Sequence, residues 1–357
     1  MLGCVAALHA SKNSGKTARF PASDPCAAAQ FAFDSEANPM PEEKHMPLPA
    51  DLTASILWAV LAALVLLAWL SALGSPLLSA SAEILADARG KVFYRKFAQQ
   101  LSKAGLIWLL AAMLLSGLVA SLRKAEAGML LALLNEQPML FLPLAIVLAL
   151  MALFAVLHAT TWRVFKESRI LHKLLGLLAA LAALASIWFA FSLSSLLTIL
   201  SQAKPAIVLQ DHFRIPATAS IWPLLGLAVM LSSACAGGLG LVYAVMRRNK
   251  DDWGRDYYGF ALRIGAGWTL LGLGSQAGFL GWAAAYLPTG LALPASLVPR
   301  IGVITMGSAL LLALLTYLFV WRSATPLRHK PAVILGALLL LLMLAGLCLT
   351  GFQLLAS

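Results

Sequence analysis

Eight apolar stretches of about 20 residues or more follow one another along most of this 357-residue chain. Each is long enough to cross a hydrocarbon core of about 30 Å as a helix. They are too long and too uniformly apolar to be barrel strands, in which apolar and polar residues alternate. The sequence therefore predicts an all-α polytopic membrane protein with eight transmembrane helices. The predicted spans cover about 52–73, 103–122, 139–160, 174–200, 220–246, 260–287, 301–321 and 331–355.

The sequence around these stretches occurs twice. Segment 93–98, FYRKFA, precedes one apolar stretch, and the similar segment 256–261, DYYGFA, precedes another. The spacing of about 160 residues indicates a duplicated unit of four helices. Because each unit has an even number of spans, both share one orientation. We expect tandem four-helix units over 46–200 and 201–357, with a site at the seam between them. Further matched residues are Trp162-Arg163 with Trp321-Arg322, and His172-Lys173 with His329-Lys330.

Basic residues gather in alternate connections between the spans. Of the 26 Lys and Arg residues, 17 flank the first, third, fifth and seventh connections, five the others, and four lie in the N-terminal tail. Such a bias marks the cytoplasmic side. The net charge of +11 is therefore read as a topology signal and not as a nucleic-acid surface. We expect a lipid-embedded chain in a bacterial-type cytoplasmic (inner) membrane, with both termini on the outer side.

Residues 1–45 differ from the rest and predict a disordered tail. They are rich in Ala, Ser and Pro, and their four basic residues would resist export to the outer side. A start at Met46 or Met40 would explain this difference. Segment 10–17, ASKNSGKT, resembles a phosphate-binding loop, but it leads directly toward a membrane helix and not into a nucleotide-binding domain.

Polar residues near the span ends are the candidate ligand contacts, because ionisable groups inside a membrane are costly. No Asp or Glu lies well inside the predicted spans, which argues against proton-coupled or sodium-coupled transport. His158 lies about 7.5 Å below the predicted end of its span. We interpret it as an interfacial or hydrogen-bonded histidine, with a quinone contact and a haem ligand as alternatives. The other ligand-binding candidates are Arg163, His172, Arg263 and Gln276.

Aromatic and basic residues at the span ends are predicted interfacial anchors in the headgroup layer. These are Tyr94, Trp162, Tyr257, Trp321, Arg322 and His329. An alternative is that they flank related pockets on the cytoplasmic side. Small residues four apart, Ala234 with Gly238 and Gly274 with Gly278, predict close helix packing, with a flexible gate as the alternative.

No motif in the chain names a reaction, and neither catalytic residues nor metal ligands are predicted. The four cysteines show no CxxC spacing. The leading hypothesis is a membrane subunit of a respiratory-type complex that docks a quinone and passes electrons to another protein subunit, which is fold-level analogy only. Haem b is not favoured, because His172 lies too near the surface to pair with His158. The alternatives are a carrier or flippase for a lipidic or neutral solute, and a non-catalytic scaffold or assembly factor.

Overall fold

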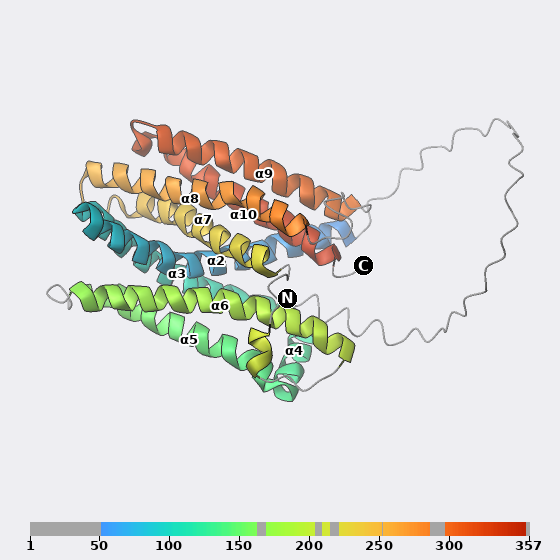
Figure 1. The fold of residues 1–357 in the computed structure, drawn as a ribbon. Coiled ribbons are helices and arrows are strands. Elements are labelled where there is room, and N and C mark those ends of the chain that lie inside the picture. Colours follow the sequence, from blue (N-terminus) through green and yellow to red (C-terminus); the bar gives the residue numbers. More distant parts are fainter. Residues whose placement is uncertain are drawn as a thin grey trace, which may run out of the picture.

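The structure is a computed structural model that describes residues 51–162, 169–203, 209–214, 221–251, 253–285 and 297–354. Within these ranges the chain is helical and has no strand (Figure 1). The predicted tail and both candidate start residues lie outside the described residues. The long helices are α2 (Asp51–Arg89), α3 (Val92–Leu122), α5 (Pro138–Thr160), α6 (Arg169–Ala203), α7 (Ile221–Arg247), α8 (Arg255–Ala284), α9 (Leu297–Arg322) and α10 (Lys330–Leu354). The short ones are α4 (Lys124–Glu136), η3 (Leu209–Phe213) and η4 (Pro326–Arg328).

Seven of the described helices are long and apolar enough to cross a membrane, so the chain is a multi-pass membrane protein. They are α2, α3, α5, α6, α7, α9 and α10. Helix α8 has 30 residues, but its Gly, Thr, Ser and Gln residues lower its mean hydropathy. It lies alongside α7 and α9 in the bundle (Figure 1). An eighth span formed by α8 stays a prediction.

Helix α2 continues far beyond the predicted end of the first span. The sequence indicated an end near residue 73, yet the helix runs through Pro76 to Arg89. The Ser and Ala residues after Pro76 resemble a loop in sequence, but they are packing residues here. Ser79, for example, is fully buried and its hydroxyl donates to the carbonyl oxygen of Ala98, 2.9 Å away. The predicted boundary was wrong because tertiary contacts decide where this helix ends.

The long helices form two groups of four with similar internal packing. In the first group α2 packs on α3 and α5 on α6, and in the second α7 packs on α8 and α9 on α10. Helices α2 and α7 meet at the centre of the bundle (Figure 1). There a Cβ at Gly74 would overlap the backbone of Ser232, so only glycine permits this approach. That the two groups arose as tandem repeats remains a prediction.

The glycines of α7 and α8 fall into two sets. A Cβ at Gly237 would lie 2.7 Å from Oγ1 of Thr269, and one at Gly238 would lie 2.6 Å from Oη of Tyr317. Gly274 and Gly278 have no described neighbouring atom within 4 Å of a Cβ position. The first set therefore brings helices together, whereas the predicted Gly274–Gly278 pair makes no such contact among the described residues.

The helix ends that flank the four basic connections lie at one end of the bundle, on the left in Figure 1. These connections join α2 to α3, α5 to α6, α7 to α8 and α9 to α10. Helix α4 and the C-terminal end of α10 lie toward the other end (Figure 1). Assignment of the basic end to the cytoplasm stays a prediction.

Candidate functional site

The structure brings two of the predicted ligand-binding residues together. His158, near the end of α5, and His172, near the start of α6, are both buried, and their ring centroids lie 4.6 Å apart. His158 was predicted to be interfacial or hydrogen-bonded, and its ring forms a hydrogen bond. His172 was predicted to lie near the surface, whereas it is buried. Their helices pack against each other and bring both imidazoles to the basic end of the bundle. Arg163 lies outside the described residues.

A carboxylate completes this group. Glu83 of α2 is only 4% exposed, and its Oε1 lies 2.9 Å from Nε2 of His158 and 3.1 Å from Nδ1 of His172. We call Glu83, His158 and His172 the polar cluster. Glu83 lies beyond the first predicted span, in the part of α2 that the prediction left out. Glu83 was not among the predicted site residues because ending the first span at residue 73 left it in a predicted loop.

Hydrogen-bond matching shows that a proton or a metal cation is required between His172 and Glu83. Nε2 of His172 lies 3.1 Å from the carbonyl oxygen of His158, so this nitrogen must donate. In a neutral imidazole Nδ1 would then carry a lone pair, and it would face the lone pairs of Glu83 Oε1. A proton or another cation between Nδ1 and Oε1 removes this repulsion. The polar cluster can therefore hold a charge that would otherwise be expelled from a buried place.

The surroundings of the polar cluster hold it in place. The indole of Trp162 packs on His172 with ring centroids 4.1 Å apart, and its Nε1 donates to Ser102 Oγ, 3.2 Å away. A Cβ at Gly176 would lie 3.0 Å from His158 Nε2, so glycine makes room for this imidazole. One turn after Glu83, Asp87 forms an ion pair with Lys173 of α6. Trp162 thus covers the polar cluster and is not solely a headgroup anchor.

A small cavity of about 10 Å³ lies beside His158, with Ser75 and Ser102 in its wall. It has room for about one water molecule and is far too small for a porphyrin. This geometry gives no support to His158 as a haem ligand.

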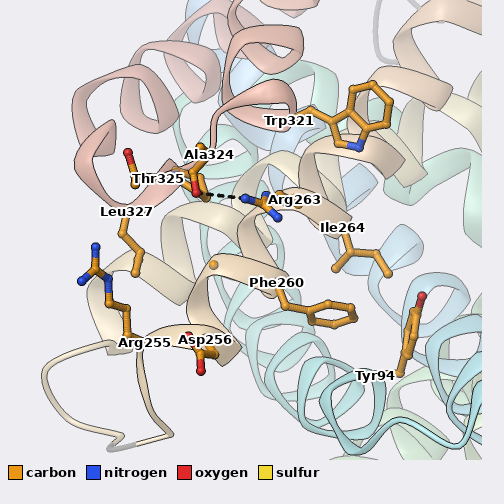
Figure 2. Close-up of a pocket in the computed structure, with 12 residues that line it drawn as sticks. Tyr94, Arg255, Asp256, Phe260, Arg263, Ile264, Trp321, Ala324, Thr325 and Leu327 are labelled. Atoms are coloured by element: carbon orange, nitrogen blue, oxygen red, sulfur yellow. Dashed lines mark hydrogen bonds between the residues drawn. The ribbon is translucent and has the colours of Figure 1, made fainter.

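A larger open cavity of about 500 Å³ lies between the two helix groups at the same end (Figure 2). We call it the seam groove. Tyr94 of α3 contributes one wall, and α8, α9 and η4 contribute the others. It is lined by Tyr94, Arg255, Asp256, Gly259, Phe260, Arg263, Ile264, Trp321, Ala324, Thr325, Pro326 and Leu327. Aromatic rings and two guanidinium groups therefore face one cavity of a size typical for small-molecule sites.

Arg263, another predicted ligand-binding residue, joins α8 to the end of α9. Its Nη2 donates to the carbonyl oxygens of Ser323 and Ala324, at 3.2 and 2.9 Å (Figure 2). These carbonyls follow the last residue of α9, so the guanidinium caps that helix end. Arg263 still has further N–H groups beside the seam groove.

The predicted anchors occupy different environments. Trp321 and Arg322 are exposed, and His329 is partly buried against the ring of Phe319, 4.6 Å away. Tyr257 is fully buried, and its hydroxyl donates to Oε1 of Gln100, 2.7 Å away. Its predicted headgroup position is wrong: it connects α8 to α3.

Tyr94 also differs from the prediction of a headgroup anchor. It is 5% exposed and its Oη accepts from Nη1 of Arg89 at 2.9 Å, so its own hydroxyl hydrogen is directed elsewhere. Gln276 is buried in α8, where its Nε2 donates to the carbonyl oxygen of Gly272, 2.7 Å away. It is remote in sequence from every residue of the polar cluster and does not line the seam groove.

Comparison with known proteins identifies a fold. No protein-family model matches this chain, and no curated protein matches it by sequence. One chain in the solved structure of bd oxidase from Geobacillus thermodenitrificans superposes with a TM-score of 0.59 and 13% sequence identity. The match covers 84% of this chain and 87% of that chain. At this identity the likeness shows that the two chains share an all-helical membrane fold.

Proposed function

We propose that this chain is a membrane subunit of a respiratory-type complex in a bacterial inner membrane. In this role it docks a quinone in the seam groove and passes electrons to a partner subunit. The observation that carries the proposal is the fold shared with a chain of a bd oxidase over most of both lengths. The seam groove adds a place of suitable size and chemistry on the chain itself.

The lining of the seam groove suits a flat ring with carbonyl groups. Phe260 and Trp321 provide apolar faces against which such a ring can stack. The Tyr94 hydroxyl and the further N–H groups of Arg263 are donors, and quinone carbonyl oxygens are acceptors. A cavity lined by apolar rings with a few polar groups is typical of small-molecule sites.

Photolabelling of the detergent-solubilised full chain tests the quinone site. We expect an azido-quinone to label peptides covering 255–264 or 321–327, and unlabelled quinone to compete. Trp321→Ala removes one apolar face and should weaken quinone binding about tenfold, which corresponds to about 1.4 kcal/mol. Trp282→Ala is the matched control, because Trp282 is an exposed tryptophan near the other end of α8.

Three other results would contradict the quinone proposal. Equal quinone affinity in Trp321→Ala and Trp282→Ala would show that quinone does not bind in the seam groove. If anionic lipid but not unlabelled quinone competes with the photolabel, the seam groove binds a lipid headgroup and not a quinone. The purified protein, with and without its co-purifying subunits, could also contain no extractable quinone and bind none. That result would favour a carrier or a scaffold.

A further inference from the structure

We infer that Glu83, His158 and His172 form a binding site for a first-row divalent metal ion such as Zn²⁺ or Fe²⁺. The three residues come from α2, α5 and α6, and one ligand atom of each lies within 4.8 Å of the other two. All three side chains are buried, so the site is enclosed by the first helix group. This inference goes beyond the proposed quinone site, which lies in the seam groove and shares no residue with the polar cluster.

Two of the three ligand-atom separations are close to those that a metal ion requires. Zinc binds histidine nitrogen and carboxylate oxygen at about 2.0–2.1 Å, which places ligand atoms of a tetrahedron roughly 3.3 Å apart. Glu83 Oε1 is 2.9 Å from His158 Nε2 and 3.1 Å from His172 Nδ1. For these two pairs an outward movement of a few tenths of an ångström gives the tetrahedral separation, and all three ligand atoms lie within 4.8 Å of one another.

The second nitrogen of His172 is arranged as in known metal-binding histidines. Its Nε2 donates to the carbonyl oxygen of His158, 3.1 Å away. A histidine ligand usually donates its other N–H to a carbonyl or carboxylate, which directs the remaining lone pair toward the metal. Here that lone pair is on Nδ1 and points to Glu83 Oε1. A metal cation at this place would bind both lone pairs and remove their repulsion.

The polar cluster also has unused coordination capacity. Glu83 Oε2 is buried and has no hydrogen-bond partner among the described residues. The cavity beside His158 has room for about one water molecule. A second carboxylate oxygen and one water would complete the coordination of an ion that has three protein ligands.

The ligand set indicates the class of metal. Two imidazoles and one carboxylate are typical of Zn²⁺ sites with an open position and of non-haem Fe²⁺ sites. The two described cysteines, Cys235 in α7 and Cys348 in α10, belong to the other helix group. Selection of a thiolate-preferring ion such as Cu⁺ is therefore not expected.

Metal analysis of the full chain tests this site. The protein is purified in detergent with a tag that contains no histidine, stripped with EDTA, and titrated with Zn²⁺. We expect about one tightly bound zinc per chain, and intense visible bands after Co²⁺ replaces it. Since loss of an outer-shell partner already lowers metal affinity by 10–100-fold, His172→Ala should lower it by about 100-fold or more.

Two further variants keep the test decisive. His329→Ala removes a partly buried histidine outside the polar cluster and should leave zinc binding unchanged. If His172→Ala does not fold, His158→Gln keeps an N–H donor toward Glu83 while removing the imidazole ligand, and it should also lose zinc. A stripped wild-type chain that takes up no Zn²⁺, or variants that retain one tightly bound zinc, would show a purely hydrogen-bonded cluster. Neither result would alter quinone labelling in the seam groove, so the two proposals fail independently.

Discussion

The two helix groups place different chemistry at one packing position. In the first group the His158 ring lies against Gly176 of α6, where a Cβ would be 3.0 Å from Nε2. In the second group the Tyr317 ring lies against Gly336 of α10, where a Cβ would be 2.7 Å from Cζ. In each case a ring on the third long helix uses a glycine of the fourth to approach it.

The neighbour on the first helix of each group makes the difference. His158 meets the carboxylate of Glu83 on α2. Tyr317 meets Gly238 on α7, and its hydroxyl has no hydrogen-bond partner among the described residues. Similar helix packing can thus surround either a charged cluster or an apolar core. The comparison locates buried ionic chemistry in the first group, and it can be tested by substitutions in both.

The largest effect is expected from Glu83→Ala. Removal of one partner of a buried ionic contact leaves an uncompensated charge and typically costs about 3–5 kcal/mol. We expect a loss of this size in the free energy of unfolding, measured in detergent by denaturant titration. A loss below about 1 kcal/mol would mean that water reaches the polar cluster and that the two groups differ less than their structures indicate.

A smaller effect is expected from filling the two glycine positions. Gly176→Ala and Gly336→Ala should each cost about 1–3 kcal/mol, since an added methyl group forces a buried ring to move. Only Gly176→Ala should also weaken zinc binding, because only there does the displaced ring belong to the polar cluster. Equal effects of both variants on zinc uptake would argue against a site confined to the first group.

The opposite end of the first group contains a further buried imidazole, which predicts a pH dependence. His212 of η3 is fully buried, with Nδ1 2.9 Å from Ser192 Oγ. Burial lowers the pKa of His212 below its ordinary value of 6.5, although the charge of Asp211 acts in the other direction. Below pH 6.5 the unfolded chain therefore binds a proton more readily than the folded chain, and stability should fall.

Thermal unfolding between pH 7.5 and 5 would measure this dependence. His212→Gln should flatten the curve, whereas His329→Ala should not. An unchanged slope in His212→Gln would assign the pH dependence to other groups.

The smallest effect is expected from Tyr317→Phe. The variant removes a buried hydroxyl that has no partner among the described residues, so the free energy of unfolding should change by less than about 0.5 kcal/mol or rise slightly. Denaturant titration beside Glu83→Ala gives the direct comparison of the two groups. A loss of 1 kcal/mol or more would show that the Tyr317 hydroxyl has a partner, such as a bound water.

The membrane class could be predicted from sequence because it depends on local properties. Apolar length and the absence of alternation identify helices that cross a bilayer, and seven such helices are found. Boundaries were less accurate. The end of α2 depends on buried Ser and Ala residues, whose environment is set by neighbouring helices and not by their own hydropathy.

The polar cluster could be predicted only in part. His158 and His172 were selected because they are ionisable groups near span ends, and the chain places them 14 residues apart. Glu83 is 75 residues from His158. A continuous α2 pattern extended past Pro76 would have placed this carboxylate at the same end as both histidines. Without that extension, nothing in the local sequence separates Glu83 from an ordinary loop residue.

That this chain is helical, apolar and membrane-embedded follows from its amino-acid order, because apolar length and helix span are properties of consecutive residues. Which polar residues meet depends on how the helices pack. Helix packing sets whether Glu83 faces two imidazoles or lipid, whether Tyr257 is an anchor or a buried link, and whether Tyr94 and Trp321 line the same groove. These outcomes depend on contacts between distant segments, for which a single sequence has no local signal.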